Sequence, residues 1–233
     1  MNRDEAILRE LNLYPQWVRR SAASVVVEPA VVAPAPTVAE PALGPGAEQP
    51  GWPELKQRVK NCNACVLRAG CKQTVFGVGD EQADWLFVGE GPGADEDERG
   101  EPFVGQAGQL LDNMLMAIKL KRGKAVYIAN VVKCRPPGNR VPEPAEIAQC
   151  LPYLQRQIQL IRPKVIVALG KTAATALLGV DATLGSLRGR VHDYQGTPLI
   201  ITYHPAYLLR TPADKAKAWQ DLRMAVATMN GLD

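Results

Sequence analysis

The stretch that decides the fold is Trp-Leu-Phe-Val-Gly-Glu-Gly-Pro-Gly, at positions 85–93. Its first four residues form a short apolar run that ends at a glycine, and such a run is typical of a buried strand. Three further short apolar runs, at 126–132, 165–169 and 199–202, have the same character. The sequence therefore predicts four strands of a buried sheet.

Apolar residues at helical spacing occupy the segments between and after these strands. Helices are expected at 110–118, 147–161, 173–178 and 216–229. Strands that alternate with helices form a mostly parallel sheet covered on both faces, so the fold class is expected to be α/β. Ligands of such sheets bind beyond the carboxyl ends of the strands, and the residues after each strand are therefore the candidates for function.

The composition of the 233 residues is that of a globular protein. Hydrophobic residues make up 46% and charged residues 22%, which excludes a wholly disordered or fibrous chain. No run reaches the ~18 apolar residues of a membrane-spanning helix, and residues 1–10 do not resemble a secretory signal. Because five cysteines occur without an export signal, we expect a reducing compartment, the cytoplasm, and no membrane partner.

The chain divides into three parts. Residues 21–51 contain six Pro, eight Ala and three Gly but no Lys or Arg. They are expected to be a disordered linker, because they have no apolar face that could offset the entropy of ordering. Residues 1–20 carry apolar residues at helical spacing and are expected to be a short helical docking peptide, the alternative being a helix packed on its own domain. Residues 52–233 are long enough for one compact domain.

The loop after the first predicted strand contains Gly89, Glu90 and Gly91. Its pattern Gly-x-Gly-x-x-Ala matches that of a dinucleotide-binding loop. However, five of the seven residues 95–101 are acidic, and they would repel a pyrophosphate. We expect instead that backbone amides of this loop approach a neutral ligand while a nearby carboxylate takes part in the chemistry.

Three further side chains stand near the expected crevice. Phe103 lies between a proline and a glycine-bearing turn and is either a core residue or a stacking platform. Asn130 lies late in its strand, where its amide suits an amide-like base edge, although a turn asparagine is the alternative. His204 follows the last strand and precedes a proline, and it is either structural or functional.

Four cysteines have a spacing that suits a metal site. Cys62 and Cys65 form a C-x2-C pair, and Cys134 and Cys150 follow with 15 residues between them. Four thiolates suit zinc or an iron–sulfur cluster. Zinc sites usually repeat the short spacing, which the second pair does not, so an iron–sulfur cluster is favoured. Cys71 lies outside this pattern and is expected to be a free thiol.

The charge is unevenly distributed. The chain has a net charge of +3, but residues 119–232 carry 17 Lys or Arg against 6 Asp or Glu. A basic half is compatible with a polyanion such as nucleic acid, the alternative being solvated lysines that keep the protein soluble.

These motifs together resemble the family 4 uracil-DNA glycosylases, the iron–sulfur branch of the uracil-DNA glycosylase superfamily, over about residues 55–230. The motifs that carry the resemblance are Gly89–Gly93, Gly100–Gly105, Asn130–Pro137, His204–Ala206 and the four-cysteine spacing. The resemblance implies a three-layer αβα fold with a central four-stranded, mostly parallel sheet. It also implies a 4Fe-4S cluster on the four cysteines and hydrolysis of the uracil–deoxyribose bond in single- or double-stranded DNA.

The resemblance also implies how uracil is bound. The nucleotide must be flipped out of the duplex, because its glycosidic bond is otherwise out of reach. Uracil would then stack on Phe103 and form hydrogen bonds with the amide of Asn130. Residues Gly89, Glu90 and Gly91 would line the pocket.

For the chemistry, His204 would donate a hydrogen bond to uracil O2, where negative charge develops as the bond breaks. Glu96 is expected to position the attacking water or to exclude the methyl group of thymine, with Glu90 and Asp97 as alternatives for this residue. The alternative to an enzyme is a non-catalytic, metal-stabilised nucleic-acid-binding module, which would not need Glu96, Asn130 and His204 together.

Two further contacts with partners are expected. The loop from Pro205 to Arg210 would enter the duplex, with Leu208 or Leu209 as an apolar wedge and Arg210 on a phosphate. Within residues 1–20, the run Leu-Asn-Leu at 11–13 and the later Trp and Arg pair resemble the start of the psi subunit of bacterial DNA polymerase III. This predicts a replication protein as the partner of the docking peptide, and we expect the enzyme to be a monomer.

Overall fold

The computed structural model of this protein describes residues 49–232. The expected docking peptide and the linker up to residue 48 lie outside the described residues, and residues 49–232 belong to one compact unit. Gln49 and Pro50 belong to this unit, because Arg156 donates hydrogen bonds to both of their backbone carbonyls. The predicted linker, which extended to residue 51, is therefore wrong at its last three residues.

The helices and strands alternate along the chain as expected. In order they are α2 (Trp52–Lys60), α3 (Leu67–Gly70), β1 (Val78–Gly79), β2 (Trp85–Gly89), α4 (Ala94–Arg99), α5 (Gln106–Ala117), β3 (Val126–Asn130), α6 (Pro144–Ile161), β4 (Val165–Leu169), α7 (Lys171–Leu178), α8 (Leu184–Leu187), β5 (Val191–Tyr194), β6 (Thr197–Thr202), α9 (Pro205–Arg210) and α10 (Lys215–Asn230). Two short 3-10 helices lie at Pro137–Asn139 and Pro212–Asp214.

The strands form one six-stranded sheet in the order β1-β3-β2-β4-β6-β5. The four inner strands are parallel, as the sequence predicts, and the two outer strands run antiparallel to their neighbours. The expected count of four strands is thus corrected to six. β1 has only two residues and β5 buries only Tyr194, so neither has the continuous apolar run that marks an inner strand.

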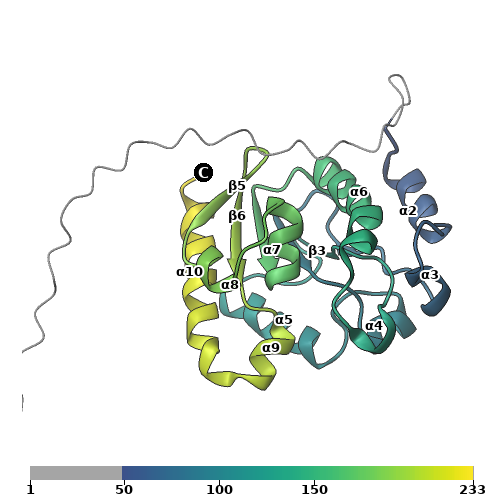
Figure 1. Ribbon diagram of the computed structural model, residues 1–233. Coiled ribbons are helices and arrows are strands. Elements are labelled where there is room, and N and C mark those ends of the chain that lie inside the picture. The colour runs from purple at the N-terminus through teal and green to yellow at the C-terminus, as the bar shows by residue number, and fades with distance from the viewer. Residues whose placement is uncertain (1–48, 233) are drawn as a thin grey trace, which may run out of the picture. The chain divides into compact units, whose positions relative to one another are not determined.

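Helices cover both faces of the sheet, which confirms the three-layer αβα architecture (Figure 1). Alternate residues of β2 point into two separate cores. Leu86 and Val88 lie in a core with residues of α6 and α7, whereas Trp85 and Phe87 lie in a core with residues of α5 and α10. Within the described range 49–232, no helix is both long and apolar enough to cross a membrane.

The register of the parallel strands brings their carboxyl ends to one edge. Gly89 at the end of β2 lies opposite Asn130 at the end of β3. Leu169 at the end of β4 likewise lies opposite Thr202 at the end of β6. The segments that follow these strands therefore begin side by side and can form a common site.

Candidate active site

A cleft of about 440 Å³ opens at the carboxyl ends of β2, β3 and β6. It is lined by segments that lie far apart in the sequence. Of the residues singled out from the sequence, the cleft brings together Glu90, Gly91, Glu96, Phe103, Asn130, His204 and Arg210.

Asn130 presents an unsatisfied acceptor to this cleft. The residue ends β3 and is 2% exposed, and its side-chain oxygen Oδ1 is buried without a hydrogen-bond partner among the described residues. A buried polar atom is normally paired, so an orphaned one indicates a site for a ligand. Gly89 makes this arrangement possible, because a Cβ at that position would stand 2.4 Å from Asn130 Oδ1.

Phe103 and His204 form two adjacent walls of the cleft. Their rings lie 5.5 Å apart between centroids at an interplanar angle of 30°. Phe103 is 5% exposed, and it packs in the core between the sheet and α5 while its ring also lines the cleft. Phe103 is therefore both a core residue and a cleft residue.

His204 is held as a neutral hydrogen-bond donor. It caps the N-terminus of α9, and its Nδ1 accepts a hydrogen bond from the backbone N–H of Ala206 at 3.2 Å. The proton of the neutral ring is therefore on Nε2. Burial, reinforced by the positive charge of Arg210 and opposed by Glu96, lowers the pKa of His204 to about 4. The ring is thus neutral near pH 7.

The three acidic candidates differ in their surroundings. Glu96 lines the cleft, and its carboxylate accepts hydrogen bonds from the backbone N–H groups of Gly93, Val104 and Gly105 at 2.9–3.1 Å. It thereby ties the loop that carries Phe103 to the start of α4. Glu90 also lines the cleft, and it accepts a hydrogen bond from the hydroxyl of Thr172 at 2.5 Å.

Asp97, the third acidic candidate, is turned away from the cleft. It is 3% exposed, and its carboxylate accepts hydrogen bonds from the backbone N–H groups of Lys72 and Gln73. Its role is to hold the segment before β1, so it is removed as an alternative for positioning water.

The segment Pro205–Arg210, expected to be a loop, is the helix α9, which begins with proline in its first turn. Leu208 is only 1% exposed and belongs to the interior, so its assignment as a wedge is wrong. Leu209 is 41% exposed, and Arg210 lines the cleft.

Tyr207 lines the cleft although our sequence analysis did not single it out. Its ring stacks on Tyr203 at 5.0 Å, and its hydroxyl donates a hydrogen bond to Asp214 at 2.7 Å. A proline directly after His204 is typical of the first turn of a helix. In a helix over residues 205–210, Leu208 faces the interior and Tyr207 does not, and the expectation of a loop missed this difference.

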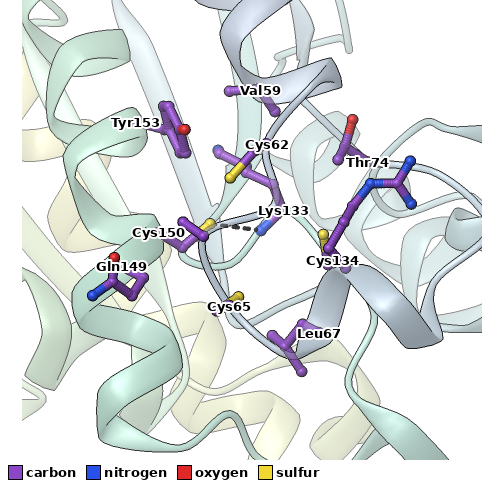
Figure 2. A pocket seen from close by; sticks show the side chains of 12 residues that line it. Val59, Cys62, Cys65, Leu67, Thr74, Lys133, Cys134, Gln149, Cys150 and Tyr153 are labelled. Carbon is purple, nitrogen blue, oxygen red and sulfur yellow. Dashed lines mark hydrogen bonds between the residues drawn. The ribbon is translucent and has the colours of Figure 1, made fainter.

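The four cysteines predicted as metal ligands line a second, smaller pocket (Figure 2). Cys62 and Cys65 come from the connection between α2 and α3, Cys134 follows β3, and Cys150 lies in α6. Cys71 is not among the lining residues. Throughout residues 49–232, no three Cys, His, Asp or Glu side chains are grouped closely enough to hold a metal ion.

A buried cation accompanies these thiols. Lys133 is 1% exposed, and within residues 49–232 its ammonium donates hydrogen bonds to two neutral oxygens, the carbonyl of Asn130 at 2.9 Å and the amide of Gln157 at 2.6 Å. Its backbone N–H donates to Cys150 Sγ at 3.1 Å. Burial lowers the pKa of Lys133 to about 8 and raises that of Cys150 to about 11. A buried charge of this kind favours an anionic neighbour.

Comparison with known proteins places the chain in a family. The family model of the uracil DNA glycosylase superfamily matches residues 76–223. A type-4 uracil-DNA glycosylase of Pyrobaculum aerophilum is 45% identical over 181 residues, which cover 73% of this chain and 91% of that protein. A type-4 uracil-DNA glycosylase of Thermotoga maritima is 45% identical over 165 residues, which cover 70% of this chain and 85% of that protein. One of Archaeoglobus fulgidus is 44% identical over 167 residues, which cover 68% of this chain and 83% of that protein. The chain therefore belongs to the type-4 uracil-DNA glycosylases of the uracil-DNA glycosylase superfamily.

Proposed function

We propose that this protein excises uracil from DNA by hydrolysing the N-glycosidic bond, which leaves an abasic site for base excision repair. The observation that carries the proposal is the orphaned Oδ1 of Asn130 in a cleft walled by Phe103 and His204. A buried acceptor without a partner costs about 1–3 kcal/mol. A base that presents an N–H group at this point would recover that free energy on binding.

Uracil has the hydrogen-bond pattern that this amide requires. Its N3–H would donate to Asn130 Oδ1, and its O4 would accept from the amide nitrogen. Cytosine has an acceptor at N3 and a donor at C4, so both pairings would fail and leave buried groups unpaired. The ring of Phe103 would support the base by stacking, and the backbone of residues 89–91 would close the pocket.

The reaction requires that the C1′–N1 bond breaks with its electron pair moving to the base. Negative charge then develops on uracil O2, to which His204 would donate its Nε2–H. A water molecule attacks C1′ and releases a proton, so the products are free uracil and an abasic sugar. Glu96 would orient this water: a carboxylate has about four lone-pair sites, and three backbone donors leave one of them free.

DNA would be held at the rim of the cleft. We propose Leu209 as the apolar residue that enters the duplex and Arg210 as a phosphate contact, with Tyr207 beside them on the first turns of α9. The rival interpretation, a non-catalytic binding module, does not explain why an orphaned amide, a neutral histidine and a carboxylate share one cleft.

We further propose that Cys62, Cys65, Cys134 and Cys150 hold a 4Fe-4S cluster. Their fit rests on two observations, a common pocket that Lys133 also lines and the buried Lys133 ammonium, which donates to neutral oxygens and whose charge thiolate ligands in that pocket would balance. A zinc ion with zinc–sulfur bonds of about 2.3 Å would hold four thiolates about 3.8 Å from one another. The iron and sulfide atoms of a cluster lie between its four ligands, so the thiolates of a cluster stand farther apart. The cluster would crosslink three segments and supply no electrons, because hydrolysis is not a redox reaction.

The remaining assignments are proposals as well. None of the five cysteines, all of which lie in the described residues, forms a disulfide, which is consistent with a reducing compartment, the bacterial cytosol or nucleoid. We propose a monomer that residues 1–20 recruit to a replication protein. Removal of residues 1–48 should then leave activity on short oligonucleotides unchanged, and a loss of activity would show that this segment belongs to the catalytic unit.

The direct test is excision from a uracil-containing single strand, followed by alkaline cleavage of the abasic site. The wild type should cleave, Asn130→Ala should lose most activity, and Asn61→Ala, at the end of α2 away from the cleft, should behave as the wild type. Binding without cleavage by the wild type would favour the non-catalytic module.

A further inference from the structure

Phe103 lies on a backbone that needs external support. Its φ is +55°, in the left-handed region that a bulky side chain seldom adopts. The ring nevertheless has a single defined place, buried between the sheet and α5 and stacked beside His204. Whatever holds the backbone at this residue therefore sets the position of the ring in the cleft.

Arg122 donates hydrogen bonds to two successive carbonyls of this backbone, those of Pro102 and Phe103. Its Nη1 donates to the carbonyl of Pro102 at 2.8 Å, and its Nη2 donates to that of Phe103 at 2.7 Å. Its Nε donates to Asp112 Oδ1 on α5 at 3.0 Å. Because the guanidinium is planar and rigid, these three bonds fix two successive carbonyls relative to α5.

The opposite side of the loop is closed by α5 itself. A Cβ on Gly108 would stand 1.8 Å from the carbonyl oxygen of Phe103, so helix and loop are already in contact. Arg122 does not line the cleft, and it lies on the connection between α5 and β3. Arg122 therefore acts on a bound base through the backbone at Phe103 and not by direct contact.

We propose that Arg122 is a positioning residue that sets the stacking surface of Phe103 and thereby the affinity of the cleft for a flat pyrimidine. This inference rests on the proposed contact between Phe103 and the base. Lysine at position 122 would keep the positive charge but lose the fork that holds both carbonyls at once. The ring would then sample several positions, and binding of the base would weaken.

The test compares Arg122→Lys with Arg156→Lys. Arg156 is a matched control, because its guanidinium also holds two successive backbone carbonyls, those of Gln49 and Pro50, away from the cleft. The readouts are kcat and KM on a single-stranded uracil oligonucleotide and the inhibition constant of free uracil. Arg122→Lys should raise KM and the inhibition constant by about tenfold, within the range of a weakened base-stacking contact. Arg156→Lys should change neither, and equal effects of the two variants would overturn the proposal.

A double-mutant cycle separates positioning from general loss of structure. In a Phe103→Leu background, Arg122→Lys should have less than about a twofold effect on the inhibition constant, because interacting residues are not additive. A full tenfold effect in that background would overturn the positioning role. Should Phe103→Leu alone leave uracil inhibition unchanged, the base contact itself fails and the inference fails with it.

If Arg122→Lys does not fold, Asp112→Asn provides a second variant. It removes the charge of the carboxylate that anchors the guanidinium while leaving the two carbonyl bonds in place. The inhibition constant should rise in the same direction but less, and an unchanged value would overturn the proposal.

Discussion

Gly89 and Asn130 lie directly opposite each other where β2 and β3 end, and the Asn130 side chain lies so close to Gly89 that a methyl group there would overlap its amide oxygen. The same methyl group would stand 2.5 Å from the edge of the Phe103 ring. The proposed base reader and stacking ring can therefore share one corner of the cleft only because residue 89 has no side chain.

Gly89→Ala should consequently lower activity by more than any loss of folded protein accounts for. The new Cβ must push aside either the amide or the ring, so we expect kcat/KM on a uracil oligonucleotide to fall by about 100-fold, comparable to the loss of ~3 kcal/mol of hydrogen bonding and stacking. Gly185→Ala is the control, because a Cβ there meets no atom within 4 Å, and it should retain full activity. Comparable activity of the two variants would contradict the proposed corner.

Asn130→Asp should weaken the preference for uracil over cytosine. A carboxylate retains acceptors for N3–H but loses the donor to O4, so each lost pairing reduces discrimination by about 1–3 kcal/mol. The measurement is the ratio of excision rates on matched oligonucleotides that carry uracil or cytosine at one position. An unchanged ratio would remove Asn130 from base selection.

His204 should make the stability of the fold depend on pH. Burial lowers its pKa from 6.5 to about 4, so protons bind more readily to the unfolded chain. The stability associated with the neutral ring is fully present above pH 6.5 and is lost as the pH falls to about 4, which corresponds to about 3 kcal/mol.

Unfolding free energies at pH 7 and pH 4 would measure this effect. Wild-type protein should lose about 3 kcal/mol more over this range than His204→Gln, because glutamine does not titrate. His192→Gln changes the other of the two histidines and should follow the wild type. Identical pH dependence of the wild type and His204→Gln would show that the ring is not buried as a neutral group.

The two leucines at the end of α9 should separate stability from DNA contact. Leu208→Ala removes a fully buried side chain and should lower the unfolding free energy by about 2–5 kcal/mol. Leu209→Ala changes an exposed side chain, so it should leave stability within about 0.5 kcal/mol of the wild type while slowing excision from duplex DNA. Unaffected duplex activity in Leu209→Ala would argue against its insertion.

Iron content should distinguish the cysteines. Cys150→Ala removes one of the four cysteines that line the smaller pocket, and the purified protein should lose iron and its brown colour. Cys71→Ala alters a buried cysteine outside that lining and should retain both. Equal iron loss in the two variants would mean that the ligand set has been assigned incorrectly.

The sequence was most informative where residues are buried on all sides. The four inner strands form continuous apolar runs, and the ends of three of them, β2, β3 and β6, lead into segments that line the cleft, whereas the segment after β4 does not. It was least informative where an isolated residue faces one of several environments. Asp97 belongs to the same acidic run as Glu96, and only the turn of α4 sends one inward and the other into the cleft.

Long-range contacts account for most of what the sequence could not predict. Arg122 lies 19 residues from Phe103, and no local pattern connects the two side chains. The edge strands β1 and β5 are similarly defined by their partners, because β1 is too short and β5 too polar to show an apolar run.

Only three residues separate Asn130 from Cys134, and Lys133 between them bonds both to the Asn130 carbonyl and to the sulfur of Cys150. Cys134, a proposed iron ligand, and Asn130, the residue proposed to recognise uracil, therefore belong to one short segment of the chain. Loss of the proposed cluster would therefore remove a support of the segment that carries Asn130, and the amide proposed to bind uracil would lose part of the framework that positions it.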